Sequence, residues 1–204
     1  MFPYTLRKIL KAMEMKGFDP VQKPYMLHLV GIRMPGNANT FNDWFTMFRK
    51  EMRMQAQIPA WEFRAFHCTT DPGLYWRLNP MNVEGTAILC PGMHEKLWTI
   101  GLHKGQYPAL VQYGKARVWR DNDKDEVLDP GPTVSGYYGI NCHRAKAKAT
   151  STIVDKWSAA CQVIADSKDD DVKMEWANTQ VERTGIETFD YMLLEDTDLN
   201  FLNV

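Results

Sequence analysis

Cysteine is scarce in this sequence, and no long hydrophobic run is present. The 204 residues include four cysteines, none of them in a C-x-x-C pair, and their spacings match no zinc-binding pattern. So small a number excludes a disulfide-rich scaffold, and we expect reduced thiols. No window approaches the roughly 18 apolar residues of a transmembrane helix, so membrane insertion is not expected. The first 20 residues lack the apolar segment and cleavage site of a signal peptide, so we expect a protein made in the cytoplasm without one.

An excess of charge of one sign is also absent. Lys and Arg total 24, Asp and Glu total 25, and the formal net charge is −1. A chain with so little net charge has no strong field to attract nucleic acid, and nucleic acid is not expected as a partner. Hydrophobic residues make up 45% of the chain, which is sufficient for a core of ordinary size.

The N-terminal part of the chain has the periodicity of two helices separated by one short strand. Apolar residues at helical spacing predict an amphipathic helix over residues 4–16, which Gly17 ends. Residues 25–32 are predicted to form a strand. A second helix is predicted over residues 40–55, because its aromatic residues would share one helical face, and core packing is preferred there over a binding surface. These aromatic residues are Phe41, Trp44, Phe45 and Phe48.

Beyond residue 60, short runs of β-branched and aromatic residues alternate with turn-forming residues. They predict strands over residues 61–69, 84–89, 97–102, 109–113, 116–120 and 136–141. Tyr113-Gly114-Lys115 is expected to form a hairpin turn between two of them. A helix is expected from the acidic residues 169–171 to about Arg183, followed by Gly185 and a last strand over residues 186–194.

These elements predict a mostly β fold of the α+β class, arranged as a sandwich or barrel rather than as βαβ units. The helical and strand elements of residues 1–58 are interpreted as an N-terminal extension. Residues 59–204 are interpreted as the domain that carries the chemistry.

One pair of residues combines a nucleophile with a base. His143 is expected at the end of a strand, and Cys161 follows 18 residues later. A thiol with a pKa near about 8.5 is only slightly ionised at neutral pH, and an imidazole beside it can produce the thiolate that attacks a carbonyl. Because neighbours on a strand point to opposite faces, only one of Cys142 and His143 can face such a site, and we expect His143. The alternative is a buried structural cysteine and a half-exposed histidine.

The residues around this pair resemble the catalytic domain of the L,D-transpeptidase (YkuD-like) family, in a divergent form. His143 is followed by 14 residues and then by Ser158-Ala159-Ala160-Cys161. The family signature has a His at a similar distance before Ser/Thr-His-Gly-Cys. The short apolar run, helix, glycine and closing strand after Cys161 also follow the family's order. The resemblance covers about residues 80–195.

The sequence departs from that signature at three positions. Ala159 stands in place of the inner His, Ala160 in place of Gly, and Val163 in place of a basic residue. The outer His, which is His143 here, remains as the base. Ala in place of Gly is expected to alter the turn that aims backbone N–H groups at an oxyanion.

The resemblance implies a β-sandwich and a cysteine enzyme that acts on peptidoglycan stem peptides without a cofactor. Cys161 would form a thioester, His143 would carry the proton, and the thioester would pass to an amine or to water. Backbone N–H groups around Ala160 would hold the oxyanion, with Ser158 and Arg144 supporting the site. The expected context is a phage-encoded, endolysin-like protein that hydrolyses the wall. A non-catalytic wall-binding or virion structural protein on the same fold is the alternative.

Further residues allow other interpretations. His103 and Tyr138 are expected to line the substrate groove, although a structural role is the simpler interpretation of His103. A zinc site built from the cysteines and histidines of this region has no supporting ligand spacing, and no metal is expected. Residues 121–125 carry the alternating acids of a calcium loop. The sixth and twelfth places of that pattern hold Glu126 and Pro132 instead of Gly and an acid, which favours a solvated loop.

Overall fold

The computed structural model describes residues 1–53, 58–125 and 127–200, which form a mostly β structure with 39% strand and 19% helix. The α+β class is therefore confirmed. The helices are α1 (Leu6–Met15), α2 (Leu74–Leu78), α3 (Ser167–Thr184) and α4 (Thr197–Asn200). The strands are β1 (His28–Arg33), β2 (Asp43–Arg53), β3 (Ile58–Thr69), β4 (Thr86–Leu89), β5 (Gly92–His103), β6 (Tyr107–Gln112), β7 (Ala116–Asp121), β8 (Val134–Gly136), β9 (Cys142–Arg144), β10 (Gln162–Ile164) and β11 (Thr188–Glu195). None of the helices in the described ranges is long and apolar enough to cross a membrane.

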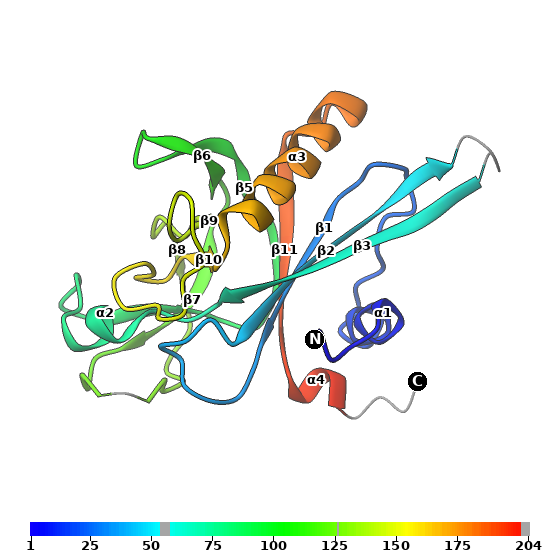
Figure 1. Ribbon diagram of the computed structural model, residues 1–204. Helices are drawn as coiled ribbons and strands as arrows, with labels where there is room; N and C mark the ends of the chain where they lie inside the picture. Colours follow the sequence, from blue (N-terminus) through cyan, green and yellow to red (C-terminus); the bar gives the residue numbers. More distant parts are fainter. Residues whose placement is uncertain (54–57, 126, 201–204) are drawn as a thin grey trace.

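Eight strands close into a barrel in the order β1-β11-β5-β6-β9-β10-β3-β2 (Figure 1). The pairs β1–β11 and β9–β10 are parallel, and the other pairs of the barrel are antiparallel. The strand pattern predicted a sandwich or a barrel, and these eight strands form the barrel; the β-sandwich that the resemblance implied is not confirmed. β1 pairs on one side with β2 and on the other with β11, and this closure removes the exposed sheet edges. A separate sheet, β4-β7-β8, adjoins the barrel.

The chain leaves the barrel between β6 and β7, where a hairpin was expected. β6 pairs with β5 and β9, whereas β7 pairs with β4 and β8. The prediction of a hairpin turn at Tyr113-Gly114-Lys115 was therefore wrong. A hairpin instead joins β5 to β6, where Lys104 and Gly105 both have positive φ. Local turn propensity indicates that the chain bends, but it does not determine which sheet the next strand joins.

β2 occupies the segment whose periodicity predicted a helix, and that prediction was wrong for residues 43–53. Residues 54 and 55 of the predicted helix lie outside the described residues. Both faces of β2 are covered, because Phe45 packs in the barrel core while Trp44 and Phe48 pack on the side of α1. A strand covered on both faces carries apolar residues without alternation. The aromatic residues of this segment are buried, which agrees with core packing.

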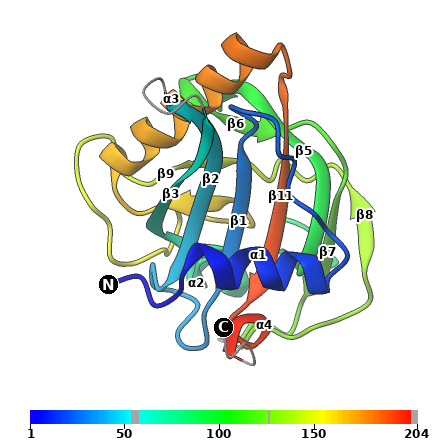
Figure 2. The same ribbon diagram turned by 90° about the vertical axis from the view of Figure 1, so that its right-hand side faces the viewer.

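α1 forms where the periodicity predicted it and lies across the outside of the barrel (Figure 2). The Thr5 side chain caps its N-terminus, and Gly17 follows its end with a φ of 78°. Ile9 and Met13 are buried in one apolar cluster with side chains of β1, β2 and β11. Strands from both sides of residue 58 thus share one barrel, and the expected domain boundary falls at the start of β3.

The strand predicted over residues 136–141 ends at its first residue. The backbone N–H groups of Tyr138 and Ile140 both donate to the side-chain Oε1 of Gln112 at 2.9 Å. Gly139 has a φ of 70°, which interrupts an extended chain. A glutamine side chain therefore replaces the backbone ladder between β8 and β9, and the prediction of a continuous strand was wrong.

The predicted helix and strand after Cys161 are confirmed by α3 and β11. Asp166 caps the N-terminus of α3 by accepting the backbone N–H of Lys168 at 2.9 Å, and Gly185 ends the helix in the left-handed conformation. Lys173, on the buried side of α3, donates from Nζ to the carbonyl oxygen of Cys142 at 3.0 Å. This bond fastens α3 to β9 at the residue before His143.

Candidate active site

Strands β9 and β10 bring His143 and Cys161 to one place. The two strands are parallel, and Val163 lies opposite His143 in their register. Cys161 immediately precedes β10, and its side chain and that of His143 line the same pocket. Cys142, the neighbour of His143, is instead fully buried in the barrel core. Alternation along β9 therefore directs the imidazole, and not the Cys142 thiol, to the pocket.

The pocket has a volume of about 250 Å³. Residues from α2, the β5–β6 turn, the segment between β8 and β9, and the turn before β10 line it. Of the residues that the sequence predicted for the site, its lining includes Cys161, His143, Ala160, His103 and Tyr138. The lining that the sequence did not predict includes Asn141, Lys104 and the aromatic side chains of Trp76 and Trp157.

The surroundings of His143 determine which of its ring nitrogens is basic. Nδ1 lies 2.7 Å from the carbonyl oxygen of Arg144 and 3.2 Å from the hydroxyl oxygen of Tyr107. Because a carbonyl oxygen can only accept, Nδ1 carries the proton. Nε2 then holds the lone pair, and it is buried without a hydrogen-bond partner in the described part of the chain. A general base requires such an unoccupied acceptor within reach of the group that it deprotonates, and within the described residues the Cys161 thiol is hydrogen-bonded to the Gly139 carbonyl oxygen and not to His143.

A second histidine, His103, stacks on the first. The ring centroids of His103 and His143 are 3.9 Å apart, and the ring planes differ by 26°. The Asn141 Oδ1 accepts the Gln112 backbone N–H at 2.9 Å, so its Nδ2 is left to donate to Nδ1 of His103 at 3.1 Å. The lone pair of His103 is therefore occupied, and His103 packs against the His143 ring instead of offering a second basic nitrogen.

Burial keeps this group of side chains uncharged. Desolvation, followed by the charge of neighbouring His103, lowers the pKa of His143 to about 3. Desolvation and then Lys104 lower the pKa of His103. Burial raises the pKa of the Cys161 thiol, and the Asn141 N–H and the Lys104 charge act in the opposite direction. At neutral pH the pair is thus a thiol and a neutral imidazole, so that proton transfer accompanies nucleophilic attack.

The thiol of Cys161 has one acceptor and one donor beside it. Sγ donates to the carbonyl oxygen of Gly139 at 3.5 Å, and the backbone N–H of Asn141 donates to Sγ at 3.5 Å. The bond from Asn141 favours the thiolate, because a negative sulfur is the stronger acceptor. Asn141 thus acts on the nucleophile through its backbone and on His103 through its side chain.

Ser158 braces the turn that presents Cys161. Its buried hydroxyl accepts the Ala160 N–H at 3.3 Å and donates to the Cys161 carbonyl oxygen at 2.8 Å. The Ala160 N–H was expected to contribute to an oxyanion hole, and in this structure it is bound to Ser158 instead. Ser158 therefore supports the site by fixing the shape of the turn.

Ala160 has a φ of 147°, a backbone conformation that L side chains rarely adopt and that glycine adopts readily. This is the position at which the resembling signature has Gly.

We expect Ala160→Gly to raise the free energy of unfolding by about 1 kcal/mol, because relief of about 1–3 kcal/mol of strain exceeds the added entropy of the unfolded chain. Urea denaturation would measure the change. Ala159→Gly is the matched control: φ is negative there, and a loss of roughly 0.5–1 kcal/mol is expected. A loss at both positions would contradict the strain at Ala160.

Arg144 contacts His143, but its side chain is not part of the pocket lining. Its carbonyl oxygen holds His143 Nδ1, and its guanidinium lies 3.8 Å from the centroid of the Tyr107 ring. Tyr107 and Asn141 contact the candidate pair, and the sequence did not single them out. Asn141 had one signal, its place two residues before His143. Tyr107 had none, because it lies 36 residues from His143 along the chain and reaches it only through the β6–β9 pairing.

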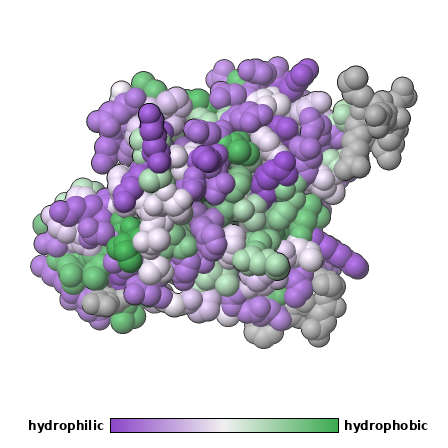
Figure 3. Space-filling model, viewed as in Figure 1, coloured by the Kyte–Doolittle hydropathy of each residue, from purple (hydrophilic) through white to green (hydrophobic). Residues whose placement is uncertain are grey.

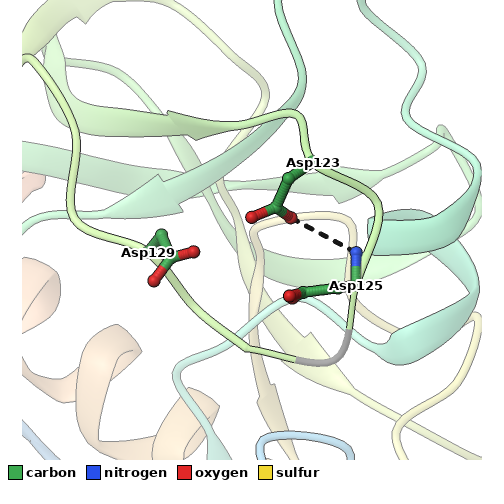
Figure 4. Close-up of side chains that lie close together, drawn as sticks. All are labelled: Asp123, Asp125 and Asp129. Carbon is green, nitrogen blue, oxygen red and sulfur yellow. Dashed lines mark hydrogen bonds between the residues drawn. The ribbon is translucent and has the colours of Figure 1, made fainter.

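An acidic cluster lies away from this pocket, in the loop after β7. Asp123, Asp125 and Asp129 bring carboxylate oxygens within 4.8 Å of one another (Figure 4). Asp123 accepts the Asp125 backbone N–H at 3.3 Å, and a hydrogen bond with Asp123 raises the pKa of Asp129. All three side chains are exposed, as in the solvated loop that the sequence favoured. Glu126, at the sixth place of the calcium pattern, lies outside the described residues.

The groups that line the pocket suit one kind of chemistry. It holds a thiol, an imidazole with a free and buried Nε2, and a backbone N–H directed at the sulfur. These groups suit nucleophilic attack on a carbonyl and transfer of the resulting acyl group. No family model, curated protein or solved structure matches the chain. The arrangement of the side chains themselves is therefore the basis for a functional assignment.

Proposed function

We propose that this protein is a cysteine-dependent acyl-transfer enzyme that acts on peptidoglycan stem peptides, in the manner of the L,D-transpeptidase family. The observation that carries the proposal is the shared pocket of Cys161 and His143, in which His143 Nε2 has no hydrogen-bond partner among the described residues. Two features add support. Ala160 has a φ that favours the Gly of the family signature. The order β9, turn, β10, α3 and β11 follows the family's order of elements.

The reaction would proceed by attack of Cys161 Sγ on a stem-peptide carbonyl, and the thiol proton would move to His143 Nε2. The tetrahedral intermediate would collapse as the C–N bond breaks, and His143 would return the proton to the leaving amine. The thioester would then be attacked by a second amine or by water, and release of the product restores the thiol. Hydrolysis corresponds to wall lysis, and we propose a phage-encoded protein as its context.

The test is incubation of the protein with purified cross-linked and uncross-linked muropeptides, followed by mass spectrometry. We expect stem-peptide products whose masses identify hydrolysis or amine exchange. Acid quenching during turnover should trap an acyl adduct on the peptide that contains Cys161. Acid protonates the attacking amine and unfolds the enzyme, so the thioester is no longer consumed. Cys90→Ala is the matched control, since the Cys90 thiol lies next to Thr133 and outside the pocket. This variant should keep full activity and the adduct.

Folded protein that yields neither product nor adduct would contradict the enzyme proposal. In that event, binding of the same protein to intact cell-wall sacculi would support the non-catalytic wall-binding or virion structural function on this fold. An adduct that forms on Cys90 instead of Cys161 would contradict the assignment of the nucleophile.

A further inference from the structure

A second pocket continues the first away from the nucleophile. It has a volume of about 300 Å³ and shares Trp76, Met81, Tyr138 and Ala159 with the pocket of Cys161. The two pockets therefore form one groove, which we call the extended groove. Figure 3 shows apolar surface at the end of the molecule that carries α2. Met81 and Tyr137, which line the second pocket, are both exposed.

Among the described residues, the charges that line the extended groove are all positive. Its two halves contain Lys104, Lys156 and Arg120, and no Asp or Glu of the described ranges lines either half. Lys104 and Lys156 lie in the half that holds Cys161, whereas Arg120 lies in the second half. A groove with cations and no lining carboxylate complements an anionic ligand, although the chain as a whole is nearly neutral.

Arg120 is held in place but not fully paired. Its Nη1 donates to the carbonyl oxygen of Gly85 at 3.0 Å, and its guanidinium lies 4.9 Å from the centroid of the Tyr138 ring. Its Nε is buried without a hydrogen-bond partner among the residues that the structure describes. Within the same residues, Arg120 forms no ion pair within 4.0 Å. A guanidinium that lines a pocket and forms no ion pair among the described residues can bind an anionic ligand through the N–H groups of its terminal nitrogens.

We propose that Arg120 binds a free carboxylate of the peptide substrate, so that the extended groove selects acyl donors carrying a carboxylate away from the reacting carbonyl. This inference rests on the proposed function, because it assigns the second half of the groove to the same stem peptide. The planar guanidinium suits a carboxylate, and its central carbon lies over the Tyr138 ring, 4.9 Å from the centroid. Arg120 is thus a specificity-determining residue and takes no part in the transfer of the acyl group.

The test measures binding to a Cys161→Ala protein, so that it does not depend on turnover. Two synthetic stem peptides are compared by calorimetry, one with free carboxylates and one in which the carboxylates are carboxamides. We expect the carboxamide to bind about tenfold or more weakly, because a charge-assisted hydrogen bond is lost. Adding Arg120→Gln should reduce the ratio of the two dissociation constants to less than about threefold, mostly by weakening the carboxylate peptide.

Arg117→Gln, three residues earlier on β7, is the matched control and should leave the ratio unchanged. Arg117 is exposed and donates to the carbonyl oxygens of Pro91 and Met93 outside the groove. Arg120→Lys keeps the charge without the planar fork and should give an intermediate ratio, which guards against misfolding of the glutamine variant. Equal binding of the two peptides, an unchanged ratio in Arg120→Gln, or no binding of either peptide would overturn the inference. Preferential binding without turnover by the Cys161 protein would contradict only the proposed function.

Discussion

Replacing Cys161 by alanine is expected to lower kcat/KM for a stem-peptide substrate by a factor on the order of 10⁴–10⁶, because the acyl group then has no acceptor on the protein. His143→Gln is expected to cause a loss of similar size. Glutamine can still donate to the Arg144 carbonyl oxygen, which His143 Nδ1 does now, but it offers no base at the position of Nε2. Single-turnover kinetics with a defined muropeptide would measure both losses.

The decisive comparison is the double variant. The losses of kcat/KM caused by substituting two groups that act together do not add. The double variant Cys161→Ala with His143→Gln should therefore have a kcat/KM within a few-fold of that of either single variant. Losses that multiply would show that His143 does not activate the Cys161 thiol. Tyr107→Phe is a milder control, since it removes one hydroxyl next to Nδ1 and leaves the Arg144 carbonyl oxygen in place. We expect it to reduce the rate by no more than about tenfold.

Replacing Lys173 by methionine is expected to lower the free energy of unfolding by about 3–5 kcal/mol. Lys173 and Asp170 form an ion pair on α3, and both side chains are almost completely buried. Lys173 Nζ also donates to the Cys142 carbonyl oxygen at 3.0 Å. The variant leaves the Asp170 carboxylate and that carbonyl oxygen buried without their shared donor, which is costly. Urea denaturation followed by circular dichroism would measure the loss.

Two controls identify burial as the cause. Lys11 and Glu14 form an ion pair in α1 with the same spacing of three residues, but both side chains are well exposed. Lys11→Met should therefore change the free energy of unfolding by less than about 0.5 kcal/mol. In the double variant Asp170→Leu with Lys173→Met, both charges are removed together, and much of the lost stability should return. A Lys173→Met protein as stable as the original would refute this account of how α3 is fixed against β9.

Several local features of the fold followed from the sequence because their causes are local. The amphipathic spacing and Gly17 determined α1, and the acidic start and Gly185 determined α3. Most of the short strands beyond residue 60 were also found, since β-branched and aromatic runs bounded by turn residues have few alternatives. The sequence likewise singled out His143 and Cys161, because their residue types and the neighbouring Ser158 match a known arrangement.

Other features were decided only by the tertiary structure. β2 is a strand because α1 covers one of its faces and the barrel core the other, which removes the alternation that would have identified it. The segment before β9 is irregular because the side chain of Gln112, from another strand, takes its backbone N–H groups. Closure of the barrel follows from pairing β1 with β11, between residues more than a hundred positions apart.

The candidate site divides in the same way. The proposed nucleophile and base could be named from the sequence, whereas the state of the imidazole could not. Tyr107 and the Arg144 carbonyl oxygen determine which nitrogen is basic, and burial keeps the ring neutral. Arg120 entered the groove only because β7 leaves the barrel to join the second sheet. Residue types are properties of the chain, but protonation, burial and neighbours depend on which strands meet, and those contacts are made across long distances in sequence.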